Sequence, residues 1–166
     1  MKRSSLLKAS GVALTITAIG GGTNAAELEE IIVTAQKRAE SLQEVPISLT
    51  AISGAKIEEA GLHSFAELST YVPNLSITEN AVNTIIAMRG ISVGANQSFE
   101  QSVGVFVDGV HYGKSRQIRT GLFDIQQAEV VRGPQGVLFG KNTLAGAINI
   151  TTATPETDQE FGGKLS

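Results

Sequence analysis

The stretch that decides the fold spans residues 123–152 and reads FDIQQAEVVRGPQGVLFGKNTLAGAINITT. β-Branched residues before Arg132 and near the end of the stretch favour two strands. Between them, a Gly-Pro pair predicts a turn, and Gly136 and Gly140 predict a compact loop. This block determines backbone shape and offers few reactive side chains.

Outside this block, short apolar runs bounded by turn residues predict more strands. The expected strands are Pro46–Ile52, Leu75–Thr78, Ile85–Arg89, Val103–Asp108, Glu129–Arg132 and Ala147–Thr152. Val103, Val105 and Val107 alternate with other residues, which is typical of a strand with one face toward a core. No internal repeat is found.

Two short helices are expected between the first strands. Ser53 is placed to cap a helix that runs through Ala60 and ends at Gly61. Ser64 and Glu67 have the spacing of a capping box, and Pro73 follows the second helix as its stop. The pattern predicts an α/β (α+β) fold with a small mixed sheet, short helices and long loops.

The N-terminus has the layout of a cleavable export signal. Lys2, Arg3 and Lys8 precede an uncharged, mostly apolar run, and Ala25 and Ala26 offer small residues for cleavage. The run is shorter than the roughly 20 residues that a membrane-spanning helix needs. Residues 1–26 are therefore expected to be a signal peptide, although an amphipathic or buried helix is the alternative.

Composition excludes several classes of function. Without residues 1–26 the chain keeps ten basic and sixteen acidic residues, and it contains no cysteine. A general nucleic-acid binder would be basic, and neither disulfides nor thiolate metal sites can form. His63 and His111 lack metal-ligand spacing, so no metal is expected.

No enzyme is indicated. The run G-V-H-Y-G-K-S at residues 109–115 has Asp108 where a phosphate-binding loop needs its first glycine. Asp108, Asp124 and Glu129 can be imagined as a carboxylate pair, but acidic turn residues are the commoner explanation. No catalytic residue and no cofactor are predicted.

The central block closely resembles the plug domain of TonB-dependent outer-membrane receptors. That family carries an E-V-x-R-G-P-Q-G-x-L-F-G-x-N segment followed by G-A-I-N-I. The matching residues here are Glu129, Arg132, Gly133, Pro134, Gln135, Gly136, Leu138, Phe139, Gly140 and Asn142. Y-V-P-N-L, M-R-G-I and V-G-V-F-V-D-G-V occur in the family's order, so the resemblance covers residues 30–155.

The resemblance implies a plug inside a barrel of about 22 strands. The plug would occlude the barrel, help to bind an iron chelate, cobalamin or another scarce nutrient, and receive energy from the coupling protein TonB. The loops at residues 80–83, 92–102 and 111–120 would face the ligand. Within them the candidate contacts are Asn80, Asn83, Asn96, Gln97, Tyr112 and Arg116.

The resemblance also makes residues 30–35 a candidate TonB box. Its members are Glu30, Ile31, Ile32, Val33, Thr34 and Ala35. The β-branched run favours a lone extended segment that can add as a strand to the edge of a partner's sheet. A plain linker strand is the alternative. Residues 39–44 are polar and suit a flexible connection, so folding is expected to begin near Val45.

Arg89 and Arg132 each precede a glycine. The resemblance implies that such arginines, together with Glu129, contact the barrel wall, because buried charges need partners. Within the chain, Arg132 can instead pair with Glu129 or Asp124 as a local ion pair.

The expected organisation is a signal peptide at 1–26, a TonB box with a flexible linker at 27–44, a plug at 45–155 and the start of a barrel strand at 156–166. A closed barrel needs more than about 200 residues. The chain is thus expected to be a truncated part of an outer-membrane transporter with its N-terminus facing the periplasm. A free-standing periplasmic module that binds a ligand or TonB is the alternative.

Overall fold

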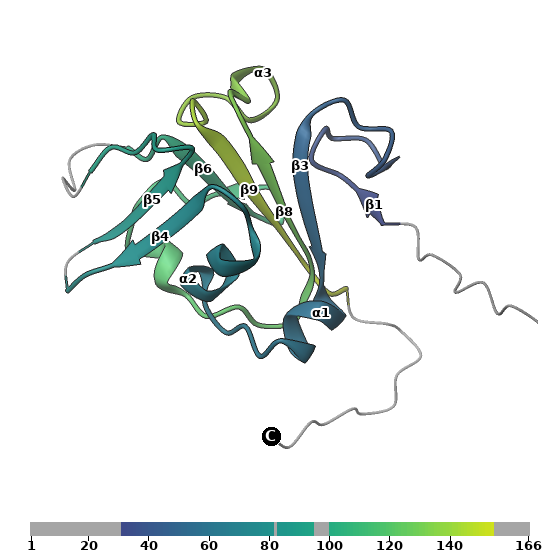
Figure 1. Ribbon diagram of the computed structural model, residues 1–166, viewed down its shortest axis with the longest axis horizontal. Helices are drawn as coiled ribbons and strands as arrows, with labels where there is room; N and C mark the ends of the chain where they lie inside the picture. The colour runs from purple at the N-terminus through teal and green to yellow at the C-terminus, as the bar shows by residue number, and fades with distance from the viewer. Residues whose placement is uncertain (1–30, 82, 95–99, 155–166) are drawn as a thin grey trace, which may run out of the picture.

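A five-stranded mixed sheet forms the centre of the molecule (Figure 1). The computed structural model describes residues 31–81, 83–94 and 100–154. The predicted signal peptide, Glu30, Asn96, Gln97 and residues 156–166 lie outside this part of the chain. The strand order in the central sheet is β3-β8-β9-β6-β7, and two separate two-stranded sheets pair β1 with β2 and β4 with β5.

Helices and strands follow one another in short steps. The strands are β1 Ile32–Val33, β2 Glu40–Ser41, β3 Ser48–Ser53, β4 Leu75–Glu79, β5 Thr84–Met88, β6 Val103–Val107, β7 Val110–His111, β8 Ile125–Arg132 and β9 Gly146–Thr152. The helices are α1 Gly54–Glu59, α2 Phe65–Leu68 and α3 Gly136–Phe139, and the 3-10 turns are η1 Ser69–Tyr71 and η2 Gln117–Arg119.

The predicted fold class is confirmed. The pair β6 and β9 is parallel, whereas β3–β8, β8–β9 and β6–β7 are antiparallel, so the sheet is mixed. β8 begins at Ile125, four residues before the expected start, and β5 ends at Met88 because Arg89 adopts a positive φ of 52°. The long block from residue 123 to residue 152 supplies the two central strands and their connection.

Both predicted helix starts are confirmed. The Ser53 side chain accepts a hydrogen bond from the backbone N–H of Lys56 at the start of α1. At α2, the Ser64 hydroxyl accepts from the Glu67 N–H, and the Glu67 carboxylate accepts from the Ser64 N–H, which completes the capping box. These caps turn the chain at the end of β3 and again before η1.

One face of the sheet, here called the front face, carries the main core. Because side chains alternate along a strand, Val130, Ile148 and Val105 point to the same side, and all three are fully buried. Phe65 and Leu68 of α2 and the inner residues of β4 and β5 pack against them. Figure 1 shows α2 and the β4–β5 pair together on this side.

The opposite side, here called the back face, carries Glu129, Val131 and Ala147, each at most 1% exposed. Residues 31–44, here called the N-terminal segment, contribute the buried side chains Val33 and Ala35. Figure 1 shows β1 beyond β3, away from α2 and the β4–β5 pair.

The expectation of a lone extended segment is wrong. β1 pairs with β2, with Ile32 opposite Ser41, and the Leu42 N–H donates to the Ile31 carbonyl. Residues 39–44 therefore turn back along the strand they follow, where the sequence suggested an unpaired connection to Val45. Val33 and Ala35 are buried in this arrangement, and burial of apolar side chains is favourable.

Gly146 allows the close approach of β9 to its neighbours. Its φ is 157°, and a Cβ placed there would lie 2.2 Å from Met88 Sδ and 2.3 Å from the Val131 carbonyl oxygen. No side chain fits at these distances without moving backbone. The glycine that enters the G-A-I-N-I run is thus required by packing.

We expect Gly146→Ala to lower the free energy of unfolding by about 1–3 kcal/mol or more, because the added methyl overpacks the site. Urea unfolding monitored by circular dichroism measures the change. Gly136→Ala is the matched control, because a Cβ there meets nothing within 4 Å. Equal stability of the Gly146→Ala variant and the wild type would contradict the packing account.

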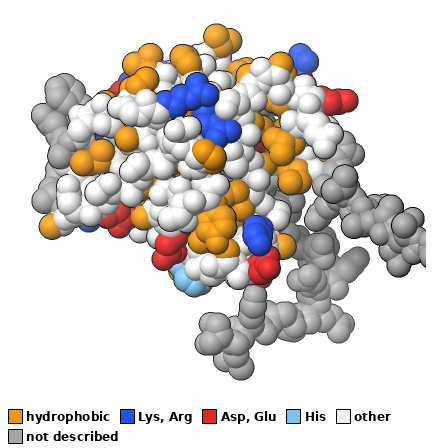
Figure 2. Space-filling model, in the orientation of Figure 1, with side chains coloured by type: hydrophobic (Ala, Val, Ile, Leu, Met, Phe, Trp, Pro, Cys, Tyr) orange, Lys and Arg blue, Asp and Glu red, His pale blue; other side chains and the backbone are white. Residues whose placement is uncertain are grey.

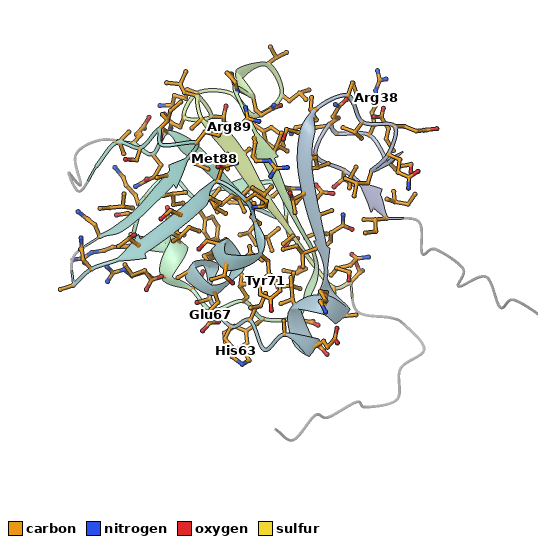
Figure 3. All side chains as sticks on the ribbon, in the orientation of Figure 1. Arg38, His63, Glu67, Tyr71, Met88 and Arg89 are labelled. Atoms are coloured by element: carbon orange, nitrogen blue, oxygen red, sulfur yellow. The ribbon has the colours of Figure 1, made fainter. Side chains whose placement is uncertain are left out.

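The Glu67 carboxylate also gives the fold a dependence on pH. Its Oε2 accepts from the backbone N–H groups of His63 and Ser64 at 2.6 and 3.1 Å. Figure 3 labels Glu67 and His63. The His63 hydrogen bond, the larger cause, and that of Ser64 lower the pKa of Glu67 below its ordinary value of 4.5.

A carboxyl whose pKa is lowered by folding stabilises the protein above its unfolded pKa, and this contribution is lost as the pH falls through the folded pKa. We therefore expect Glu67→Gln to be less stable than wild type at pH 7, with the gap closing as the pH falls below 4.5 and through the lower folded pKa. Thermal unfolding across this pH range measures the gap. A gap of constant size would show that the amides do not hold the carboxylate.

Candidate functional site

The candidate partner-binding residues lie on the back face as a strand with both edges occupied. On one edge, the Ile31 carbonyl accepts from the Leu42 N–H at 3.0 Å. On the other edge, the Gln127 side-chain amide donates to the Ile32 carbonyl at 3.0 Å, and the Thr34 N–H donates to Glu129 Oε1 at 2.5 Å. Val33 and Ala35 are buried, while Ile32 is 46% exposed.

Glu129 is a buried carboxylate with a full set of donors. It is 1% exposed. Besides the Thr34 N–H, it accepts from Gln127 Nε2 at 3.1 Å and from Asn149 Nδ2 at 3.0 Å, and the Thr34 hydroxyl lies 3.4 Å from each oxygen. Burying an ionised group is costly unless such bonds satisfy it.

The local ion pair between Glu129 and Arg132 is not formed. The two residues are three apart on β8, so their side chains point to opposite faces of the sheet. Arg132 Nε instead donates to Ser48 Oγ at 2.9 Å, and its Nη1 donates to the Pro73 carbonyl at 3.4 Å. Asp124 does not contact Arg132 within the described part of the chain.

Arg89 and Arg132 meet at one end of the domain. Arg89 Nη1 would lie 3.8 Å from a Cβ on Gly133, the residue after Arg132. Figure 3 labels Arg89 at this end, and Figure 2 shows basic side chains gathered there. Among the described residues the ion pairs are Lys56–Glu59 and Lys141–Glu100, and neither includes these arginines.

The plug-like motif forms an exposed tip between β8 and β9. The Gly133 N–H donates to the Ala145 carbonyl and the Gln135 N–H to the Thr143 carbonyl, both at 2.9 Å. Pro134 lies between these two bonds, and α3 follows them. Gly133 and Gly140 adopt φ of 111° and 77°, values that favour glycine. Val137 is 99% and Leu144 72% exposed, so the tip presents apolar side chains to its surroundings.

Two of the predicted ligand-facing loops are joined. Arg119 in η2 donates through Nη2 to the Asn80 carbonyl and through Nε to Thr84 Oγ1. Ser115 Oγ donates to Asn83 Oδ1 at 3.4 Å. These bonds connect the β4–β5 turn with the loop that follows β7.

The described residues that were predicted to contact a ligand differ in their exposure. Arg116 is exposed beside this junction, whereas Tyr112 is half-buried and packs against the main core. Asn83 is 6% exposed, so its side chain is mostly withdrawn from the surface, while Asn80 is exposed. The loops therefore offer Asn80 and Arg116 to a ligand more directly than Asn83 or Tyr112.

A hollow lies beside the N-terminal segment on the back face. Its lining residues are Thr34, Lys37, Phe106, Asp108, Gly109, Phe139, Asn149 and Thr151. Phe106 packs against His111 and Phe139, and the Lys37 ammonium lies 5.8 Å from the centre of the Phe139 ring. The hollow has aromatic walls and few charges.

The described residues form neither a metal-binding cluster nor a membrane-spanning helix. In the described ranges, His, Asp and Glu do not gather in threes that can hold a metal ion. Across the same residues, each helix is too short or too polar to cross a bilayer.

Gln127 and the contact of Glu129 with Thr34 were missed by the sequence analysis. A signal was available, because a carboxylate inside a run of strand residues needs buried partners. The identity of those partners was not readable, since Thr34 and Glu129 lie 95 positions apart.

Comparison with known proteins decides the family. Residues 41–147 match the model of the TonB-dependent receptor plug domain. The chain belongs to this plug family. The matched range contains the two arginines and the joined loops, and β1 lies just ahead of it.

Relatives of this plug domain are outer-membrane receptors and transporters. The pesticin receptor of Yersinia pestis is 35% identical over 131 residues, which cover 76% of this chain and 19% of the receptor. The vitamin B12 transporter BtuB of Vibrio vulnificus is 30% identical, over 79% of this chain and 22% of the transporter. The chain thus spans about a fifth of the length of these relatives.

A solved receptor structure is similar to this chain in fold as well as in sequence. The crystal structure of the ferric yersiniabactin uptake receptor FyuA from Yersinia pestis matches with a TM-score of 0.60 and 35% identity, over 66% of this chain and 17% of the receptor. The relatives are receptors and transporters, not enzymes.

We expect Arg119→Ala to free the β4–β5 turn from the loop after β7. Two hydrogen bonds are lost, each worth about 1 kcal/mol, so exchange of the Asn80 and Asn83 amides should accelerate. Hydrogen exchange measured by NMR gives the rates. Arg116→Ala is the matched control, because it removes the same charge from an exposed neighbour. Equal exchange in both variants would show that Arg119 does not join the loops.

Proposed function

We propose that this chain is the plug of an outer-membrane TonB-dependent active transporter. It occludes a barrel of about 22 strands, helps to bind a scarce nutrient, and receives energy through TonB. The observation that carries the proposal is the plug match over residues 41–147, with an extended strand at Ile32–Val33 just ahead of it.

Strand addition is the proposed contact with TonB. Ile31, Ile32, Val33, Thr34 and Ala35 are the proposed contact residues, preceded by Glu30. An extended segment can pair through its backbone with an exposed sheet edge, and such pairing transmits force along the chain. Its position before the first strand of the central sheet supports this role, since a pull on β1 acts directly on the back face.

A surrounding barrel is the proposed partner of the arginine end. Arg89 is exposed and Arg132 half-buried, and within the described residues neither has a carboxylate partner. Acidic groups on a barrel wall would supply one. The exposed apolar side chains of Ile91, Val137 and Leu144 also suit a covering surface. Glu129 is not proposed for this contact, because its oxygens are occupied inside the chain.

The proposed ligand is a small nutrient such as an iron chelate or cobalamin. The names of the relatives include a ferric yersiniabactin uptake receptor and a vitamin B12 transporter. The joined loops around Asn80 and Arg116 offer polar and cationic groups to such a ligand. The proposed location is the outer membrane, with the N-terminus facing the periplasm after removal of residues 1–26.

We expect Ile32→Pro to abolish capture of the chain by the C-terminal domain of TonB. Proline removes a backbone N–H and fixes φ, so it interrupts strand pairing. A pull-down with the purified TonB domain measures capture.

Ile32→Ala is the control, because it shortens the side chain but keeps the backbone donor. Main-chain pairing tolerates such a change, so capture should persist. Undiminished capture of the Ile32→Pro variant would remove the proposed contact.

A further inference from the structure

Residues 31–35 of the N-terminal segment are held in the manner of a strand between two others. Successive residues of a strand direct their backbone groups to opposite edges. Accordingly, Ile31 bonds to Leu42, which follows β2, whereas Ile32 and Thr34 bond to side chains of β8. An incoming strand therefore finds the backbone groups of residues 31, 32 and 34 already used.

We propose that Gln127 and Glu129 act as a substitute strand edge that keeps the segment closed to its partner until their bonds break. The inference rests on the proposed function for the identity of the partner, TonB. It assigns to Glu129 a role inside the plug, where the family resemblance suggested a contact with the barrel.

The spacing of the two side chains matches the spacing of the groups they bind. Gln127 and Glu129 are two residues apart on β8 and point to the same face. Ile32 and Thr34 are also two residues apart, and two residues of extended chain span about 6.8 Å. One amide donor and one carboxylate acceptor thus meet one carbonyl and one N–H, as two backbones do in a sheet.

The two bonds differ in strength. The Thr34 N–H bonds to an ionised group at 2.5 Å, and hydrogen bonds to charged groups are the stronger class. The carboxylate is also 1% exposed, so release of Thr34 leaves a buried oxygen with fewer donors. Glu129 therefore penalises opening more than Gln127 does.

Side-chain burial adds to the hold. Val33 and Ala35 are 1% and 0% exposed on the back face. Strand addition to a partner would expose them unless they stay in place while the edges change. A partner strand must therefore directly replace the hydrogen bonds that Gln127 and Glu129 make to the segment.

The absence of native cysteine permits a clean test of opening. Ala35→Cys places one thiol at a buried position, and its labelling rate with a maleimide reports how often the segment opens. We expect Glu129→Ala in this background to raise the labelling rate at least about tenfold, the size expected for a lost hydrogen bond to a charged group.

Glu129→Gln should restore slow labelling in part, because the carboxamide oxygen can still accept from Thr34. Gln127→Ala tests the other bond without removing the buried carboxylate, and it should raise the rate severalfold even if Glu129→Ala folds poorly. Asn149→Ala is the matched control: it removes a donor to Glu129 but no bond to the segment, so it should change the rate less than Gln127→Ala.

Capture by the TonB domain tests whether Gln127 and Glu129 compete with TonB for the backbone groups of the segment. Gln127→Ala and Glu129→Ala should each bind it more tightly than the parent chain, by a factor similar to the rise in labelling. Unchanged labelling in both variants would overturn the inference, as would faster labelling with TonB binding equal to wild type. Faster labelling with no TonB binding to any variant would support the claim that Gln127 and Glu129 keep the segment closed. It would also refute TonB as the coupling partner.

Discussion

The structure depends on one constraint, which is that the central strand β8 is buried on both faces. Val130 and Ala128 point into the main core, while Val131 and Glu129 point to the back face, and all four are at most 1% exposed. A strand buried on both sides needs cover on both sides. Helices and the β4–β5 pair cover the front, and the N-terminal segment covers part of the back.

This constraint explains why the segment proposed to meet TonB is folded into the domain. Its apolar residues complete the back face, and its backbone satisfies a carboxylate that would otherwise be buried without enough donors. The same backbone groups that a partner strand would use are those that stabilise the plug. Contact with a partner and release from the plug are therefore expected to be one exchange of hydrogen bonds.

The other features are distributed around the same sheet. The arginines lie where β5 and β8 end, and the motif tip projects from the connection of β8 to β9. The joined loops lie at the β4–β5 turn, connected through Arg119. Residues with positive φ, such as Arg89 and Asp108, end short strands and begin turns. These turns give a small domain several exposed sites. Each exposed site can then contact a different partner without altering the core.

The sequence by itself determined the local elements and the family. Capping residues, alternation and glycine positions act over a few neighbours, so Ser53, Ser64 and the strands around Val105 and Ile148 were predictable. Only the tertiary structure decided which distant groups meet. Thr34 and Glu129 are separated by 95 positions, and Arg132 turned away from Glu129 because strand alternation placed them on opposite faces. Long-range hydrogen bonds depend on the register and stacking of whole elements, which no local pattern encodes.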